Sequence, residues 1–372
     1  MPDSPENRLC RIQRAIELQA VEGIGLVYAR RLWELLGPLR HWTDVNFEKL
    51  QHKQRNTWRN RLIMLERQNY ADRQLYVFAK ENWQVVLIDD KDYPPYLRHL
   101  VDAPLFLLVK GNSTHLLRQH IALVGTRSPS KEGLKICARL IQSIPFSGRK
   151  NGLSIVSGLA RGIDAQAHKT ALSEGLCTIA ILGNPPQHIY PPEHFGLAEE
   201  IVSNGGLLVT EFLPDVISRP YHFAQRNRVI GGMSKLTIVV ESALKGGALI
   251  TARRAYDENR DVFAVPGRCG DKPSQGCNYL IAQHIAQLIE DPETFWSSYS
   301  NCIQFGLAAG IAPLSVEAQA LLNYIAQNDK VSLEIMTDTF GNNFPVCETL
   351  LELETARIVS FHKGGYYSIH AP

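Results

Sequence analysis

Eight short, uninterrupted apolar segments constrain the fold of this chain more than any other feature. They are WQVVLID, PLFLLVKG, HIALVGT, LSIVSG, CTIAILG, GLLVTE, LTIVVES and DVFAVPG, between residues 83 and 267. Continuous rather than alternating hydrophobicity indicates strands buried on both faces, as in parallel sheets covered by helices. The stretches between them are long enough for crossover helices, expected to start near Lys131, Gly162, Glu193, Ala224 and Ala248. The pattern predicts a Rossmann-like, doubly wound, mostly parallel α/β sheet over residues 81–300.

Different patterns flank this region. Residues 1–80 are predicted to be a helical domain, in which Gly23 and Gly25 form a turn before an amphipathic run that Gly37 ends. This turn fits a helix-hairpin-helix that aims amides at DNA phosphate, and equally an element that only packs two helices. Residues 301–372 contain three helical runs and a hairpin around Gly364-Gly365, which predicts a winged helix. Its wing offers only Lys363, so we assign it no DNA contact.

Composition describes a soluble protein of two or three domains. The 372 residues are 45% hydrophobic and 20% charged, and contain no apolar run of membrane-spanning length and no secretory signal. We therefore expect a cytoplasmic protein without membrane contact. The seven cysteines are scattered without a C-x-x-C pair, which favours reduced thiols and no metal site. A net charge of +2 is too small to indicate nucleic-acid binding by itself. Only local clustering of positive charge could indicate it.

Polar, glycine-bearing turns follow several of the predicted strands. In an open parallel sheet, ligands bind at the carboxyl ends of the strands. Glycine there lets an anion approach the backbone, amides at a helix start donate hydrogen bonds to the anion, and arginine binds phosphate through two parallel hydrogen bonds. These turns predict a site for a phosphate chain, with Asp164 and His168 as supporting residues that order an arginine and pack. Phe223, Tyr221 and Tyr256 lie beside the basic turns and either stack on bases or fill the core. The candidate binding residues are Gly125, Thr126, Arg127, Ser157, Gly158, Arg161, Gly162, Arg226, Asn227, Arg228, Lys245, Gly246 and Gly247.

Two nucleotide-enzyme signatures are missing from the sequence. No Gly-Lys pair occurs, so the chain has no P-loop, and no G-x-G-x-x-G follows a strand as in NAD enzymes. We therefore expect no cofactor and no ATP hydrolysis.

The motifs VGTRSPS, IVSGLARGIDAQAHKTAL, HFAQRNRVIGG and GGALITARRAYDENRDVFAVPG resemble those of the DNA-processing protein A (DprA, or Smf) family, from DDKDYPPYL to DPETF. The resemblance implies a non-enzymatic homodimer that binds and protects incoming single-stranded DNA during natural transformation and loads the recombinase RecA. It also implies a SAM-like N-terminal domain and a C-terminal winged helix. Carried onto this chain, the DNA pocket falls on Arg127, Arg161, Arg226, Arg228 and Lys245.

Two segments depart from the family pattern. Gly183-Asn184-Pro185-Pro186-Gln187 stands where a glycine-rich turn is usual, and prolines lack the amide donors that a phosphate needs. His284-Ile285 stands where a glycine-alanine pair is usual, so contacts there, including a dimer surface, are expected to differ.

Two alternatives remain open. One is a nucleotide phosphoribohydrolase of related fold, although Arg253 and Arg254 follow Gly246-Gly247 where that class needs a carboxylate. Glu211 and Glu241 at strand ends keep this reading open. The other is an adaptor that contacts proteins through its terminal domains.

Overall fold

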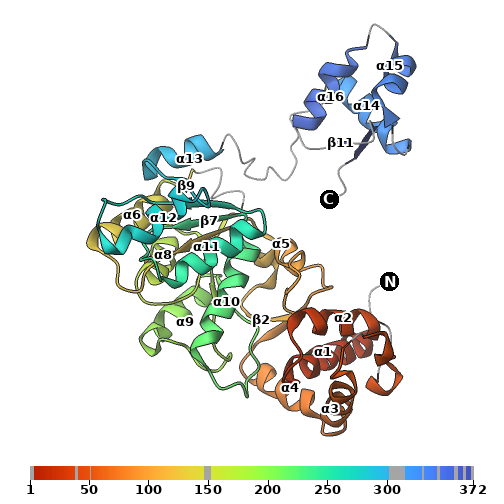
Figure 1. Ribbon diagram of the computed structural model, residues 1–372, viewed down its shortest axis with the longest axis vertical. Coiled ribbons are helices and arrows are strands. Elements are labelled where there is room, and N and C mark those ends of the chain that lie inside the picture. The colour runs from red at the N-terminus through yellow and green to blue at the C-terminus, as the bar shows by residue number, and fades with distance from the viewer. Residues whose placement is uncertain are drawn as a thin grey trace. The chain divides into compact units, whose positions relative to one another are not determined.

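The computed structural model describes residues 4–37, 41–50, 52–145, 152–300, 315–328, 331–341, 344–355, 359–362 and 366–369. The chain divides into two compact units, Met1–Gly306 and Leu307–Pro372, which are described separately. The first unit contains the N-terminal helices and the large sheet, and the second contains the last three helices (Figure 1).

The first unit is built on a nine-stranded sheet with the order β1-β2-β6-β5-β4-β3-β7-β8-β9. Strands β3 to β9 pair in parallel, whereas β2 is antiparallel to both β1 and β6. All eight apolar segments form strands, and the mostly parallel α/β fold is confirmed. The strands are β1 (Gln84–Leu87), β2 (Phe106–Lys110), β3 (His120–Val124), β4 (Ser154–Ser157), β5 (Cys177–Ile181), β6 (Leu207–Thr210), β7 (Leu236–Val239), β8 (Asp261–Ala264) and β9 (Gln287–Leu288).

Two apolar cores, one on each face of the sheet, account for the buried strands. Helices α6, α8 and α13 contribute to one core, and α10 and α11, which pack on each other, contribute to the other. Helix α10 begins at Pro220, earlier than the expected Ala224, because proline is well suited to a first helical turn. The helices are α5 (Pro95–Arg98), α6 (Lys131–Gln142), α8 (Ile163–Ser173), α9 (Phe195–Ser203), α10 (Pro220–Met233), α11 (Gly247–Asp257), α12 (Gln275–Ala282) and α13 (Pro292–Ser300).

Four helices precede the sheet: α1 (Pro5–Ala20), α2 (Leu26–Leu36), α3 (Arg55–Arg67) and α4 (Tyr70–Lys80). These helices and the segment between α2 and α3 bury large side chains, among them Leu32, Trp42 and Trp58. The expected turn and stop are present, because Gly23 has φ +88° and Gly37 ends α2 with φ +48°. The apolar side chains of these helices continue into the core of one sheet face.

The second unit contains three helices and a three-stranded antiparallel sheet of order β10-β12-β11, the elements expected of a winged helix. Leu350 and Leu353 are buried in its core. Lys363 and the Gly364-Gly365 turn lie outside the described residues. The elements are α14 (Val316–Gln327), β10 (Val331–Ser332), α15 (Leu333–Phe340), α16 (Val346–Thr355), β11 (Val359–His362) and β12 (Tyr366–Ile369).

Candidate nucleic-acid interface

A cleft of about 360 Å³ lies where β3, β4 and β7 end. Strand β3 has β4 on one side and β7 on the other, so the cleft occupies a topological switch point of the sheet, where open α/β folds bind ligands. Eight residues singled out from the sequence line it together. They are Gly125, Thr126, Arg127, Asp164, Arg226, Asn227, Gly246 and Gly247.

The turn after β3 is fixed by its backbone on both sides. The Thr126 amide donates to the Glu241 carbonyl at 2.7 Å, and the Thr126 carbonyl accepts from the Ile163 amide at 3.2 Å. Gly162 has φ +79°, and a Cβ there would lie 2.3 Å from the Thr126 carbonyl oxygen. A Cβ on Gly125 would lie 2.5 Å from Ile163. Glycine is therefore required at both positions for the turns after β3 and β4 to meet.

Arg127 projects from this turn and is exposed. Its guanidinium carbon lies 5.9 Å from the centre of the Phe223 ring, which in turn packs against Tyr190 at 5.3 Å. A cation held beside an aromatic ring can contact phosphate while the ring and its neighbour offer faces to bases. Tyr221 and Tyr256 are also exposed, but neither lines the cleft.

Arg226 forms part of the cleft floor and is 3% exposed. Its guanidinium donates to the Gly158 carbonyl at 2.6 Å and to the Ile181 carbonyl, so it joins the ends of β4 and β5. Burial lowers the pKa of Arg226 to about 10, with Asp164 opposing this shift and Arg127 adding to it. At neutral pH the floor therefore carries a buried positive charge. A Cβ on Gly158 would lie 2.5 Å from this guanidinium, so the glycine makes room for it.

Asp164 is the only carboxylate among the described residues that line the cleft. It accepts from the Gly158 amide at 3.1 Å and the Ala160 amide at 3.4 Å, which holds the turn after β4 against the start of α8. Burial raises the pKa of Asp164, while Arg226 and these hydrogen bonds act against that rise. Its Oδ2 atom is therefore engaged in positioning the turn after β4.

His168, one turn further along α8, is fully buried. The Thr178 hydroxyl lies 2.7 Å from His168 Nδ1 and 3.0 Å from the Ile155 carbonyl oxygen. Because the hydroxyl gives its single hydrogen to that carbonyl, His168 must donate from Nδ1 and leave Nε2 unprotonated. Burial lowers the pKa of His168 to about 3, with further contributions from Arg226 and His194. The residue is a neutral packing group beneath the site.

The start of α11 closes the remaining side of the cleft. Its N-cap is Gly246, with no side-chain cap and no acidic residue in the first turn. The Gly246 amide donates to the Ala243 carbonyl and the Leu249 amide to the Gly246 carbonyl, so the amides of Gly247 and Ala248 are the ones that can face an anion. Asn227 on α10 donates to the Gly247 carbonyl at 3.3 Å and ties the two helices together. Lys245 is exposed and precedes Gly246, although it does not itself line the cleft.

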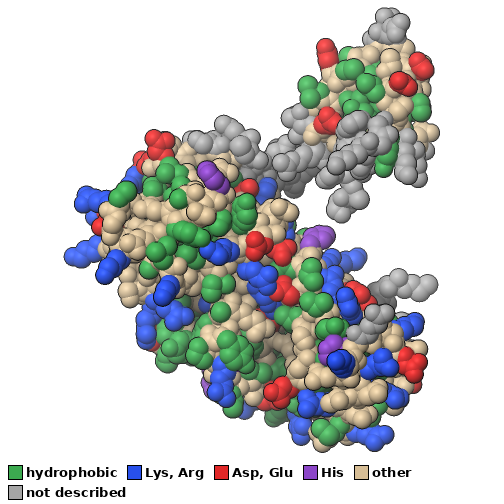
Figure 2. Space-filling view, viewed as in Figure 1, with side chains coloured by type: hydrophobic (Ala, Val, Ile, Leu, Met, Phe, Trp, Pro, Cys, Tyr) green, Lys and Arg blue, Asp and Glu red, His purple; other side chains and the backbone are tan. Residues whose placement is uncertain are grey.

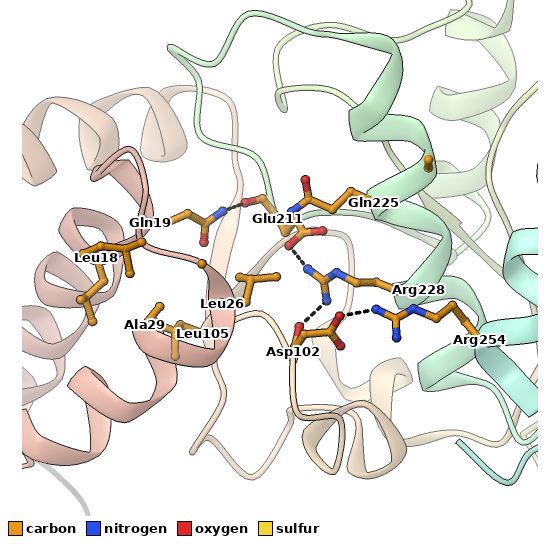
Figure 3. Close-up of a pocket in the computed structure, with 13 residues that line it drawn as sticks. Leu18, Gln19, Leu26, Ala29, Asp102, Leu105, Glu211, Gln225, Arg228 and Arg254 are labelled. Atoms are coloured by element: carbon orange, nitrogen blue, oxygen red, sulfur yellow. Dashed lines mark hydrogen bonds and ion pairs between the residues drawn. The ribbon is translucent and has the colours of Figure 1, made fainter. Parts of the chain in front are cut away.

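Arg228, by contrast, lies in a different pocket, of about 410 Å³, formed with the N-terminal helices. It is 4% exposed, contacts the Glu211 carboxylate and donates to the Asp102 carbonyl at 2.6 Å. Figure 3 shows Arg228 between Glu211 and Asp102, whose carboxylate pairs with Arg254 at 2.5 Å. The sequence grouped Arg228 with Arg226, but the two point to different pockets because residues two apart on a helix do not share a face.

Five more predicted residues stand outside the cleft lining: Ser157, Gly158, Arg161, Gly162 and Lys245. Arg161 is exposed and pairs with Glu193 at 2.5 Å, which raises the pKa of Arg161. Ser157 is buried and donates to the Leu123 carbonyl at 2.6 Å. Lys245 is described above. Apolar lining residues such as Ile230 and Ala243 were missed because nothing in their side chains indicates an anion site.

The carboxylates that kept an enzymatic reading open have structural partners. Glu211 binds Arg228, and burial raises the pKa of Glu211, with Arg228 acting in the opposite direction. Glu241 accepts from the Ser130 hydroxyl at 2.7 Å and the Ser130 amide at 3.1 Å, at the start of α6. Neither lines the cleft. Within the described ranges no group of three potential metal ligands occurs, and no helix is long and apolar enough to cross a membrane.

The two departures from the family pattern have different outcomes. Asn184 donates to the carbonyls of Pro185 and His188, and Pro186 lines a separate groove, so neither proline lines the cleft. His284 adopts φ +56°, a conformation that favours glycine.

Comparisons with known proteins agree with this arrangement. The family profile described as DNA recombination-mediator protein A matches residues 84–300. Protein Smf of Escherichia coli K12 is 36% identical over 297 residues, covering 77% of each chain. DNA processing protein DprA of Streptococcus pneumoniae R6 is 38% identical over 225 residues, covering 60% of this chain and 78% of the relative.

Two solved structures have the same fold. The X-ray structure of DNA processing protein A from Streptococcus pneumoniae matches with a TM-score of 0.65 and 29% identity, covering 78% of this chain and 97% of that one. DNA processing protein A from Helicobacter pylori, solved to describe its single-stranded DNA binding mode, matches with a TM-score of 0.52 and 27% identity. It covers 60% of this chain and 98% of that one.

Proposed function

The chain belongs to the DNA recombination-mediator protein A family, and on that premise we propose that it binds single-stranded DNA in the cleft above β3, β4 and β7. The observation that carries this proposal is the meeting of three anion-binding features in one cleft. Exposed Arg127, the floor charge of Arg226 and the open amides at the start of α11 all face the same space. A flexible phosphate chain is the ligand that satisfies all three.

The aromatic residues beside the cleft favour a single strand over a duplex. The Phe223 ring lies 5.9 Å from the guanidinium carbon of Arg127 and packs against the exposed Tyr190, where an unpaired base can stack. Such stacking contributes about 1–3 kcal/mol per base and tolerates any sequence, whereas bases in a duplex are already paired and stacked. The protein therefore binds single strands tightly and with little base preference.

In the cell this binding serves recombination. The chain acts as a cytoplasmic homodimer that protects incoming single strands during natural transformation and passes them to RecA. We expect it to perform no chemistry on the DNA, since the carboxylate that lines the described cleft, Asp164, has its Oδ2 held by the amides of Gly158 and Ala160. Incubation with nucleoside monophosphates is expected to release no free base, and release that depends on Asp164 would favour the phosphoribohydrolase alternative.

The binding proposal is tested with Arg127→Ala and Lys245→Ala, using the anisotropy of a labelled oligodeoxythymidine of about six nucleotides. Each lost phosphate contact lowers the slope of log affinity against log salt by about 0.7. We expect weaker binding, with a slope reduced by about that amount in each variant. Lys169→Ala is the matched control, because this exposed charge on α8 neither lines the cleft nor adjoins a lining residue in the chain, whereas Lys245 adjoins Gly246. Unchanged affinity and slope in both variants would show that the strand lies elsewhere.

A further inference from the structure

Positive charge is concentrated in the N-terminal helices, away from the residues that line the cleft. Residues 1–80 hold 14 of the 39 lysines and arginines but 9 of the 37 acidic residues, a net charge of +5 that leaves −3 for the rest of the chain. Figure 2 shows lysine and arginine side chains spread over the surface of these helices, with fewer acidic ones among them. Asymmetry of this kind favours a polyanionic partner over general solubility.

The charge is most concentrated around the start of α3. Residues 49–65 contain five lysines and arginines and no acidic residue. Trp58 and Leu62 turn one side of α3 into the core, and Arg55 and Arg59, one turn apart, lie along its flank. Lysine and arginine in this position are unfavourable for the helix itself. Arg55 is at the positive end of the helix dipole, and like charges four residues apart repel each other.

A cluster of rings joins α3 to α2 beneath these charges. His52 stacks on Trp58 at 4.2 Å, and Tyr28 on α2 contacts His52 at 4.7 Å. Arg31 lies over the Tyr28 ring at 5.5 Å. The rings therefore bring a cation of α2 alongside those of α3. We define the N-terminal basic face as Arg31, Lys53, Arg55 and Arg59.

The cations of this face are available to a partner. None of the four forms an ion pair with any described residue, whereas Arg8, Arg11, Arg14 and Arg30 on the neighbouring helices do. The nearby turn adds one acidic side chain, Glu22, whose backbone carbonyl accepts from Arg61 at 3.0 Å. A local arrangement that costs helix stability and leaves cations unpaired is typical of a binding surface.

We propose that the N-terminal basic face binds the phosphodiester backbone of DNA, as a second contact surface in addition to the cleft. The face contacts phosphates rather than bases, because Trp58 is buried and its ring cluster is occupied internally. It therefore binds without sequence preference, and only a polymer that extends beyond the cleft reaches both surfaces. Affinity rises with strand length through the combined action of two linked sites.

The test uses the full chain carrying Lys53→Ala and Arg59→Ala, compared with an Arg67→Ala and Lys80→Ala control of equal charge change on exposed positions of α3 and α4. Anisotropy is measured with single strands of about six and about 40 nucleotides and with a duplex of the longer length. We expect the first pair to weaken binding of the long DNA about tenfold, with a salt slope lower by about 1.4 for a single strand. The control changes affinity by less than twofold, and the six-mer is unaffected in both.

Weaker binding of the long single strand or of the duplex supports the proposal, and the form affected identifies which backbone the face holds. No loss with either form, or equal loss in the control, overturns it. So does equal loss with the six-mer. The outcome is separable from that of the proposed function, because Arg127→Ala tests the cleft with the six-mer alone.

Discussion

Acid is expected to destabilise the protein through His168, and the size of the effect follows from its surroundings. Burial, together with the nearby Arg226 and His194, lowers the pKa of His168 to about 3 in the folded protein, from its ordinary value of 6.5 in an open chain. A histidine whose pKa is lowered by folding stabilises the native state fully above pH 6.5. That contribution is lost as pH falls toward 3, because His168 binds a proton in the unfolded chain but stays neutral in the folded protein.

Between pH 7.5 and pH 5 this loss amounts to about 2 kcal/mol, since 1.5 pH units below the unfolded pKa correspond to about 1.4 kcal/mol each. The measurement is urea unfolding of the parent chain and of His168→Gln at both pH values, followed by circular dichroism. Other groups titrate equally in both proteins, so the difference between the two pH dependences isolates His168. The variant is expected to lose about 2 kcal/mol less than the parent on acidification.

His120 provides an internal check on this reasoning. It is fully buried, it lies 3.0 Å from the Leu116 carbonyl through Nε2, and burial lowers its pKa to about 4. His120→Gln should remove a similar acid dependence, and the double variant should remove both. Parallel pH profiles for the parent and His168→Gln would show that the ring takes up a proton in the folded protein, and would refute the lowered pKa of His168.

Two further predictions concern residues that the structure placed in unexpected settings. Arg228→Met should destabilise the fold by about 3–5 kcal/mol, because it leaves the Glu211 carboxylate buried without its cation. Thermal unfolding measures this loss, and six-mer affinity per folded molecule should stay within twofold, which a DNA-contacting Arg228 would not allow. His284→Gly should stabilise the protein by about 0.5–1 kcal/mol by relieving a left-handed backbone at an exposed position. A lower unfolding temperature in that variant would contradict the strain argument.

The sheet was predictable because its strands are apolar over their whole length. Every such segment formed a strand, while β9, with two exposed residues, carried no comparable signal. The antiparallel pairing of β2 with β6 could not be predicted either, because continuous hydrophobicity indicates that a strand is buried but not in which direction it runs.

The candidate site was predictable to the level of turns but not of side-chain directions. Glycine-bearing strand ends correctly brought Gly125, Arg127 and Gly246 to one cleft. Sequence spacing could not separate Arg226 from Arg228, nor reveal that Glu193 would pair with Arg161. Those outcomes depend on partners distant in the chain, which a local pattern does not contain.

Helix α10 carries both Arg226 and Arg228, which line two different pockets. Arg226 donates to the turn after β4, which borders the cleft. Arg228 contacts Glu211, whose backbone carbonyl accepts from Gln19 at the end of α1. Because both arginines lie on α10, a rotation of this helix that changes the contacts of Arg226 also changes those of Arg228. The residues that border the cleft and those that hold the N-terminal helices therefore share one rigid element.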